Sequence, residues 1–350
     1  MWKKSEYSKK QINDAGRHVS DSSISPEKRM EYLSIIDNWR AAHAFPMNTF
    51  AVNLRRQVSD IPGAIVAQRL KRLDTIRGKM ERFPDMKLHR MQDIGGCRVI
   101  VPTVDDVYKV KDRLEKSRIR HEAKTPKDYI KAPNPQTGYR GVHLIYKYKS
   151  DRNTDYNGLS VEIQIRTRLQ HMWATAVETV GLFTDNGLKF NQGSQDWLDF
   201  FRMISELFAI KEKKHPRYND DAYILDLTKR ISLLDNELAA RKKMNVISIA
   251  ADGLWTNNKK RGNGYYLLVL NFDDRKISIK RYEGIQKGLD EATAAYNKIE
   301  QTKGNERIDA VLVSAQSYDA ITKAYQNYFA DIQGFMDTLN SLLKKYKTKN

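Results

Sequence analysis

Apolar and polar positions follow two alternating periods along the chain, and the period predicts where helices and strands lie. From Tyr32 to Ala42 apolar residues recur at helical spacing, after the capped start Ser25-Pro26-Glu27. We therefore expect a helix over residues 25–60, interrupted at Pro46.

The next part of the chain changes to short runs with the period-two pattern of strands. Strands are expected at 64–71, 97–101, 142–148 and 159–165, and helices at 104–118 and 167–181. This alternation predicts a mixed α/β segment over residues 60–185.

The remainder is expected to hold more helix and a second small unit. Helical patterns cover 195–212 and 221–243, followed by a hairpin signal (Tyr265 to Leu270, the turn Asp273-Asp274, then Lys276 to Tyr282), a helix at 285–302, a strand at Ile308–Ser314 and two helical stretches. We predict an α+β fold: a mixed sheet flanked by helices, with a small C-terminal α/β domain. The expected domains are an N-terminal helical region 1–60, the sheet domain 61–195, a helical linker 196–244 and the C-terminal domain 245–350.

Composition and charge narrow the function classes. A chain of 350 residues with 40% apolar content is globular in type, and its formal net charge of +18 favours polyanionic partners such as nucleotides, tRNA or ribosomes. A basic surface that serves only solubility explains the charge equally well. The single cysteine, Cys97, excludes an internal disulfide framework and a cysteine-rich zinc site. With no secretory signal and no long apolar run, we expect a cytoplasmic protein without a membrane partner.

Two carboxylates occur where a metal could be held. Asp93 precedes Gly95-Gly96 and a strand, and Glu162 shares one strand face with Gln164 and Arg166. Carboxylates on neighbouring strands can bind Mg²⁺, which commonly bridges substrate phosphates. The alternative is two surface acids paired with Arg98 or Arg166.

A Pro- and Gly-rich loop from Asp128 leads into the strand that holds His143. Tyr139 lies near the end of this loop, where an aromatic ring can stack on a nucleobase.

Four motifs in this segment resemble, in order, those of the RelA/SpoT synthetase domain, which has a nucleotidyltransferase-like fold. They are Arg69-Leu70-Lys71 with Thr75 and Lys79, Asp93-Ile94-Gly95-Gly96-Cys97-Arg98, Gly138-Tyr139-Arg140-Gly141-Val142-His143, and Glu162-Ile163-Gln164-Ile165-Arg166-Thr167. The resemblance implies a pyrophosphokinase that uses ATP as donor and Mg²⁺ as cofactor, and it gives residues 61–195 the role of transferase domain.

The resemblance also implies a role for each matching residue. The implied ATP-binding residues are Arg69, Lys71, Thr75, Lys79 and Arg98. Asp93 and Glu162 would hold Mg²⁺ and act in catalysis together with Tyr139, and Glu162 would also help deprotonate the acceptor hydroxyl. The implied acceptor-binding residues are Tyr139, Arg140, His143, Lys131 and Gln164.

The chain departs from the family pattern chiefly on the acceptor side. Gly141 replaces a serine and Asn134 stands where alarmone synthetases usually have a lysine, while Thr75 replaces a serine on the ATP side. The segment 173–178 also differs from the family's usual residues. The acceptor is therefore open between GDP or GTP, giving (p)ppGpp, and the 3′-hydroxyl of the tRNA CCA end; DNA is not expected as a partner.

The tail suggests how such an enzyme would be controlled. Tyr325 and Tyr328 match the Y-x-x-Y element of the fused toxin–antitoxin, capsid-sensing CapRel family, and their spacing places both on one helix face. That resemblance implies an autoinhibitory C-terminal domain, released by a phage major capsid protein in antiviral defence. Alternatively, the tyrosines form an aromatic core stripe, or the tail serves oligomerisation or allostery. A third alternative is that the whole protein is a non-enzymatic RNA-binding protein.

Overall fold

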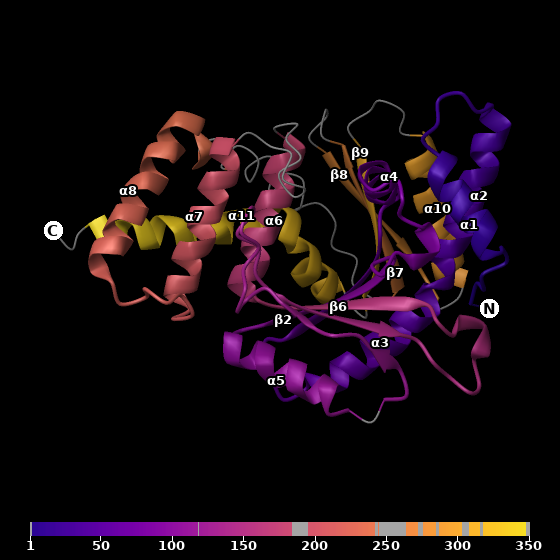
Figure 1. Ribbon diagram of the computed structural model, residues 1–350, viewed down its shortest axis with the longest axis horizontal. Coiled ribbons are helices and arrows are strands. Elements are labelled where there is room, and N and C mark those ends of the chain that lie inside the picture. The colour runs from indigo at the N-terminus through magenta and orange to yellow at the C-terminus, as the bar shows by residue number, and fades with distance from the viewer. Residues whose placement is uncertain are drawn as a thin grey trace.

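The computed structural model describes residues 2–117, 119–183, 195–241, 244, 264–271, 276–284, 287–302, 308–315 and 318–347 (Figure 1). Its N-terminal half consists of α1 (Lys9–His18), α2 (Pro26–Ala42), α3 (Ala44–Gln57), β1 (Ile65–Leu70), α4 (Leu73–Arg82), β2 (Gly95–Val101), α5 (Val104–Glu115), β3 (Glu122–Ala123), β4 (Lys127–Asp128), β5 (Val142–Lys147) and β6 (Ser160–Thr167). The C-terminal half consists of α6 (Arg168–Phe183), α7 (Gln195–Lys211), α8 (Asp221–Leu238), β7 (Gly264–Asn271), β8 (Lys276–Tyr282), α10 (Lys287–Thr302), β9 (Ile308–Ala315) and α11 (Tyr318–Lys347).

The larger sheet is mixed, which confirms the predicted α+β architecture. Its strands run in the order β1-β2-β6-β5-β3, with β4 also paired to β5. β2 and β6 are parallel and the other pairs are antiparallel. In the parallel pair Gly96 lies opposite Glu162, so the entrance of β2 is next to the Glu162 position of β6.

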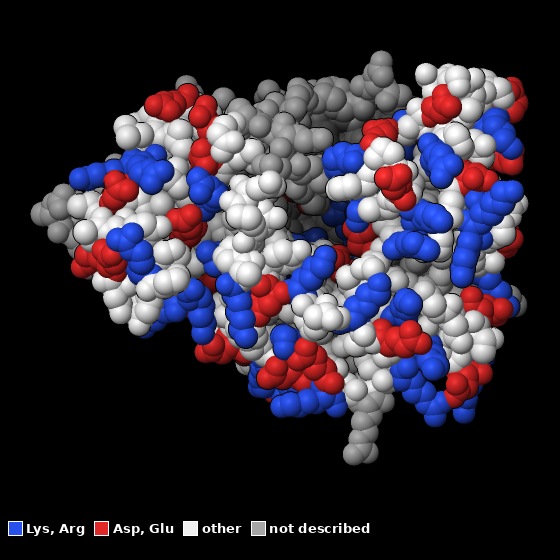
Figure 2. Space-filling view, in the orientation of Figure 1, with Lys and Arg blue, Asp and Glu red and all other residues white. Residues whose placement is uncertain are grey.

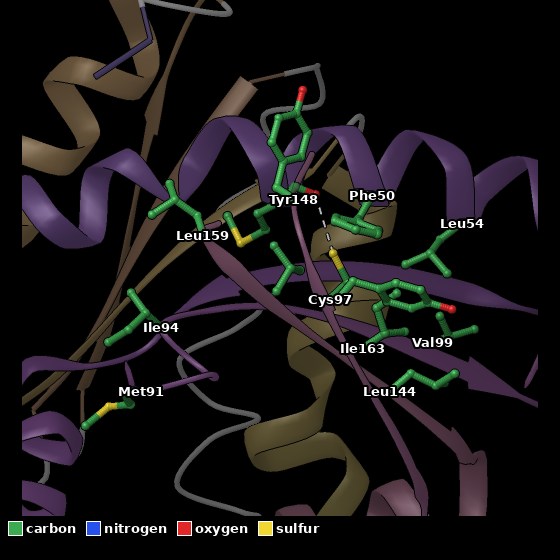
Figure 3. Close-up of a cluster of buried hydrophobic side chains, with 14 of the residues drawn as sticks. Phe50, Leu54, Met91, Ile94, Cys97, Val99, Leu144, Tyr148, Leu159 and Ile163 are labelled. Atoms are coloured by element: carbon green, nitrogen blue, oxygen red, sulfur yellow. Dashed lines mark hydrogen bonds between the residues drawn. The ribbon is translucent and has the colours of Figure 1, made fainter. Parts of the chain in front are cut away.

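One face of this sheet is apolar and packs against helices. Figure 3 shows Phe50 and Leu54 of α3 beside Cys97 and Val99 of β2. The Cys97 Sγ donates to the Met47 carbonyl, and burial raises the pKa of this thiol to about 12. Because side chains alternate along a strand, burying Cys97 and Val99 directs the side chain of Arg98 to the opposite face.

The helix predicted over 25–60 is two helices, and the break differs from the expected one. α2 starts where predicted, because Ser25 accepts a hydrogen bond from the Lys28 amide and Pro26 occupies its first turn. The chain changes direction at His43, and Pro46 lies in the first turn of α3, where its missing N–H costs no hydrogen bond.

The helices after the sheet form a second apolar core. Buried residues of α6, α7, α8 and α11 share one cluster, with Phe201, Phe208 and Phe335 near its centre. The two helical stretches expected at the end of the chain are instead the single helix α11. Its glycine, Gly334, packs so closely on α6 that an added Cβ would lie 2.9 Å from the Met172 Sδ.

The C-terminal strands form a separate antiparallel sheet in the order β8-β7-β9, as the hairpin signal predicted. β9 and α11 both contact β1, so this smaller sheet lies against the edge of the larger one (Figure 1). Asp273-Asp274 lie outside the described residues. No helix in the described ranges is long and apolar enough to cross a membrane.

A buried carboxyl group lies where α11 meets α6, and it predicts a pH-dependent contribution to stability. Burial raises the pKa of Asp331 to about 6, although Arg168 and Arg98 act to lower it, and its Oδ2 lies 3.7 Å from the His171 Nε2. Since folding disfavours the ionised form, stability falls as pH rises from about 4 to about 6. We expect Asp331→Asn to raise the free energy of unfolding by on the order of 2 kcal/mol above pH 6, and not at pH 4.

Urea unfolding at both pH values measures this difference. Asp337→Asn, on an exposed position of the same helix, is the control and should give no pH-dependent gain. A loss of stability in Asp331→Asn above pH 6 would mean that an ionised pair with His171 stabilises the fold, contrary to this account.

Candidate active site

A cavity of about 360 Å³ lies between the open face of the larger sheet and α6. In Figure 2 the surface is hollowed between α6 and α4. The cavity wall comprises Ala67, Gln68, Arg69, Lys71, Thr75, Asp93, Gly96, Cys97, Arg98, Tyr129, Asn134, Thr137, Tyr139, His143, Glu162, Gln164, Arg166, Trp173, Ala174, Thr175, Val177 and Glu178.

Two lysines hold a carboxylate at the entrance of β2. The Lys71 Nζ lies 2.6 Å from the Asp93 Oδ2, and the Lys79 Nζ lies 3.1 Å from the Asp93 Oδ1. Burial acts to raise the pKa of Asp93, but the two ammonium groups outweigh it and lower that pKa to about 2. Burial also lowers the pKa of Lys71, against the opposing effect of Asp93. Asp93 is therefore ionised at neutral pH and placed to exchange its lysine partners for another cation.

A continuous hydrogen-bonded chain crosses the cavity floor from β6 to the loop before β5. The His143 Nδ1 lies 2.9 Å from the Glu162 Oε1, and the His143 Nε2 lies 2.6 Å from the Tyr139 hydroxyl. The Arg166 Nε donates to the same hydroxyl at 2.9 Å. Gln164 closes the chain, because its Nε2 donates to the Glu162 Oε2 and its Oε1 accepts from Arg166.

These hydrogen bonds affect the pKa of Glu162 and so determine its ionisation state. Burial acts to raise the pKa of Glu162. The hydrogen bond and charge of His143 act in the opposite direction and outweigh burial, so the pKa of Glu162 is lowered overall. Burial raises the pKa of the Tyr139 hydroxyl, although Arg166 acts to lower it. Glu162 is thus a carboxylate with a direct hydrogen-bonded route to His143 and Tyr139.

Residues 68–181 match the protein family described as a region found in RelA / SpoT proteins. This segment is a RelA/SpoT region. It contains every residue of the lysine–carboxylate cluster and of the hydrogen-bonded chain across the cavity floor.

Several curated proteins are similar to part of the chain. GTP pyrophosphokinase YjbM of Bacillus subtilis is 35% identical over 116 residues, which cover 33% of this chain and 54% of the relative. GTP pyrophosphokinase YwaC of the same organism is 34% identical over 113 residues, covering 31% of this chain and 52% of the relative. The chain thus spans about half the length of these relatives.

Solved structures also align with part of the chain. The crystal structure of small alarmone synthetase 2 from Bacillus subtilis covers 51% of this chain and 94% of its own, at 23% identity and a TM-score of 0.43. That of small alarmone synthetase 1 bound to its product pppGpp covers the same shares, at 23% identity and a TM-score of 0.42.

The fold of the RelA/SpoT region brings most of the sequence-predicted site residues together. Those that line the cavity are Arg69, Lys71, Thr75, Asp93, Arg98, Tyr139, His143, Glu162 and Gln164. Lys79 reaches the cavity through Asp93. The two carboxylates carry the contacts described above with Lys71, Lys79, His143 and Gln164.

Two of the predicted acceptor residues lie elsewhere. Arg140 is buried, and its Nε donates to the Ser205 Oγ at 3.2 Å, on the far side of the loop from the cavity. Lys131 is exposed, with its Nζ 5.5 Å from the centre of the Tyr108 ring. Tyr325 and Tyr328 fall within α11, but their side chains lie outside the described residues.

Sequence reasoning did not assign a role to several residues of the cavity wall. Arg166 had been placed on the Glu162 strand face but not in the site, where its guanidinium lies 4.9 Å from the centre of the Tyr139 ring. Glu178 of α6 lies 3.8 Å from Arg69 and 3.4 Å from Arg72. Glu178 could have been found from the sequence, because it belongs to the segment 173–178 that differs from the family's usual residues. Trp173 and Val177 of this segment share one helix face, and Glu178 lies beside them.

The two carboxylates fit a magnesium ion. Asp93 and Glu162 offer oxygen ligands from neighbouring strands of one cavity, and Mg²⁺ is commonly held by one or two carboxylates with substrate phosphates completing its shell. Among the described residues no group of three His, Cys, Asp or Glu side chains converges as a metal site. Asp93 and Glu162 would supply two ligands of a bound Mg²⁺, and substrate phosphates or water would supply the others.

The two acceptor-side departures have structural roles in the loop. The Asn134 Oδ1 accepts from the amides of Gln136 and Thr137, so Asn134 closes the turn and adds no charge to the cavity. Gly141 has φ +152, and an added Cβ would lie 3.0 Å from the Tyr139 hydroxyl oxygen. The absent side chain leaves room for that hydroxyl between His143 and Arg166.

We expect Gly141→Ser to displace the Tyr139 hydroxyl and break its hydrogen bond to His143. The unfavourable φ adds a cost of about 1–3 kcal/mol in the free energy of unfolding. Urea unfolding measures stability, and nitrogen NMR of the His143 ring reports the hydrogen bond at Nε2.

Gly158→Ser is the matched control, because Gly158 also has a positive φ (+85) but open space around its missing Cβ. It should cost stability without altering His143. An unchanged His143 ring in Gly141→Ser, with a loss of stability no larger than in the control, would contradict the steric account.

Proposed function

We propose that the protein transfers the pyrophosphate group of ATP to a ribose 3′-hydroxyl of a nucleotide acceptor. The main support is that two carboxylates, Asp93 bound by lysines and Glu162 bound by His143, face one cavity inside a RelA/SpoT region. Two curated relatives of the chain bear the name GTP pyrophosphokinase, which supports the reaction class.

The donor side of the cavity supplies positive charge. Arg69, Lys71 and Arg98 line the wall next to Asp93, and Lys79 reaches Asp93 from α4. We assign ATP to this side, with Thr75 beside its phosphates. Mg²⁺ bound by Asp93 and Glu162 would neutralise charge on the phosphates, and the lysines released from Asp93 could then donate to phosphate oxygens.

The acceptor side supplies the route for the proton. The acceptor oxygen forms a bond to the β-phosphorus of ATP, the bond from that phosphorus to the α–β bridging oxygen breaks, and AMP leaves with the bridging oxygen. Glu162 takes the hydroxyl proton and can pass it to His143 along their 2.9 Å hydrogen bond. Attack and departure in line need no covalent intermediate on the protein.

We propose the 3′-hydroxyl of the tRNA CCA end as the acceptor, so that transfer would block aminoacylation. Two features support this choice over a free guanine nucleotide. Asn134 closes the turn where alarmone synthetases usually carry a lysine, and the cations Lys131 and Arg140 of the same loop lie away from the cavity. The second candidate, GDP or GTP as acceptor, is favoured by the names of the curated relatives.

We further propose that the C-terminal segment restrains the enzyme. α11 and β9 contact β1, which carries Arg69 into the cavity wall. Arg40 links the two parts, because its Nε donates to the Lys71 carbonyl at 3.0 Å and its guanidinium lies 4.7 Å from the centre of the Tyr296 ring of α10. Release by a phage major capsid protein, with Tyr325 and Tyr328 as the blocking residues, follows from the family resemblance.

The assay is incubation with γ-labelled ATP and Mg²⁺, with either bulk tRNA or GDP plus GTP as acceptor. It is run on the full chain and on the full chain carrying Tyr325→Ala and Tyr328→Ala, since restraint would hide activity in the unaltered protein. We expect label in tRNA, and a loss of at least about a hundredfold in rate when Asp93→Asn or Glu162→Gln is added, because each removes a charged group from the reacting centre.

Asp112→Asn on the exposed face of α5 is the control for loss of a carboxylate and should leave the rate unchanged. Label in a guanine nucleotide alone would select the second candidate. Equal transfer by Asp93→Asn, Glu162→Gln and the unaltered protein would refute the proposed function.

A further inference from the structure

A second groove lies on the other side of the loop 129–141 that leads into β5, here called the acceptor loop. It has a volume of about 550 Å³ and lies between this loop, the side of α7 and the turn that precedes α8. Asn134 lines both the groove and the cavity, so the two spaces are separated only by this loop. A chain molecule whose end occupied the cavity could therefore continue into the groove.

The loop between the two spaces is fixed by contact with α7. The Ser205 Oγ donates to the Gly138 carbonyl, and an added Cβ at Gly138 would lie 3.0 Å from the Arg202 Cα. Gly138 has φ +76, which other residues rarely adopt. The wall of the groove is thus held by contacts between the loop and α7.

The cations of the acceptor loop face this groove. Among the described residues, no carboxylate oxygen lies within 4 Å of the Lys131 ammonium or the Arg140 guanidinium. Burial lowers the pKa of Arg140, which is 8% exposed, since only the more distant Glu212 and Glu206 oppose that effect. A buried guanidinium without a bridging carboxylate favours the approach of an anion.

Two further cations border the groove and are partly neutralised. The Arg202 NH2 lies 2.5 Å from Asp199, and the Lys214 Nζ lies 2.8 Å from Asp105. Glu206 is the one acidic residue of the groove lining, and its Oε2 accepts the Tyr223 hydroxyl. In Figure 2, Lys and Arg side chains gather where α7 meets the start of α5, beside acidic residues of α5.

Aromatic rings interleave with these charges. Tyr108 lies beneath the Lys131 ammonium. Tyr223 is half-buried at the opposite border, stacked on His215 at a centroid distance of 5.4 Å, with the Arg217 guanidinium 4.0 Å from the centre of its ring. Cationic side chains alternating with aromatic rings are typical of surfaces that bind single-stranded nucleic acid.

We infer that this groove binds the phosphodiester backbone of a single-stranded RNA whose 3′ end enters the cavity. The inference rests on the proposed function, because it takes the acceptor to be a polynucleotide. It also deepens that function, since a GDP or GTP acceptor ends at its 5′-phosphates, whereas a polynucleotide continues through further phosphodiesters along the groove. The groove would thus distinguish a tRNA end from GDP or GTP.

The test measures binding of a short fluorescent single-stranded RNA ending in CCA to the full chain, by anisotropy over a range of salt concentrations. We expect Lys131→Ala and Lys214→Ala each to weaken binding about three- to tenfold and to lower the salt dependence by about one ion. Lys28→Ala, on the exposed surface of α2, is the matched control and should bind as the unaltered protein does. Unchanged melting temperatures establish that the variants are folded.

The inference would be overturned if Lys131→Ala, Lys214→Ala and the control bound RNA with the same affinity and the same salt dependence. So would an acidic peptide of equal charge that binds as tightly as the RNA, since the groove would then select charge alone or a protein partner.

The transfer assay separates this inference from the proposed function. RNA binding that depends on Lys131, without label transfer to any RNA, would refute the proposed function and support the groove. If label appears in tRNA and the KM for tRNA is the same in Lys131→Ala and in the unaltered protein, only the proposed role of the groove is refuted.

Discussion

The parallel pairing of β2 with β6 determines where the charges of this protein meet. It places Gly96 opposite Glu162, so that the carboxylate preceding β2 and the carboxylate within β6 face one cavity. A shift of one residue in that register would turn Glu162 and Gln164 into the apolar face that packs against α3. The lysine contacts of Asp93 and the hydrogen bonds of His143 both depend on this pairing.

The two carboxylates are charged for different reasons, and this difference suits a two-substrate reaction. Asp93 is held ionised by two lysines, whereas Glu162 is held ionised by His143 and Gln164. Cations around the first acid favour a phosphate-rich donor. The imidazole hydrogen-bonded to the second acid offers a route for a proton.

Local pattern was sufficient to predict the longer strands and most helices, because the period-two and helical spacings are properties of short segments. It did not predict the helix α1 or the two-residue strands β3 and β4. It also indicated which residues would face the cavity, since alternation along β1 and β6 puts Arg69 and Lys71, or Glu162 and Gln164, on one side. The parallel pairing itself has no local signal. It brings Asp93 and Glu162 together across a separation of 69 residues in the sequence.

The residues that the sequence misplaced are those whose direction depends on distant packing. Arg140 lies in the motif of the acceptor loop, but α7 packs on that loop and draws its guanidinium to Ser205. The sequence predicts that the helix is interrupted at Pro46, whereas the two helices are separated at His43 and Pro46 lies in the first turn of α3. In both cases a correct local rule was overridden by contacts that no short segment contains.

We propose that Asp93 belongs to a magnesium-dependent nucleotide site and is not simply paired with lysines. We would titrate the full chain carrying Tyr325→Ala and Tyr328→Ala with a non-hydrolysable ATP analogue by calorimetry, with and without Mg²⁺, and repeat the titration after adding Asp93→Asn. We expect Mg²⁺ to strengthen analogue binding when Asp93 is present and to have no such effect when Asp93→Asn is added. An equal effect of Mg²⁺ in the two proteins would show that Asp93 does not hold the metal.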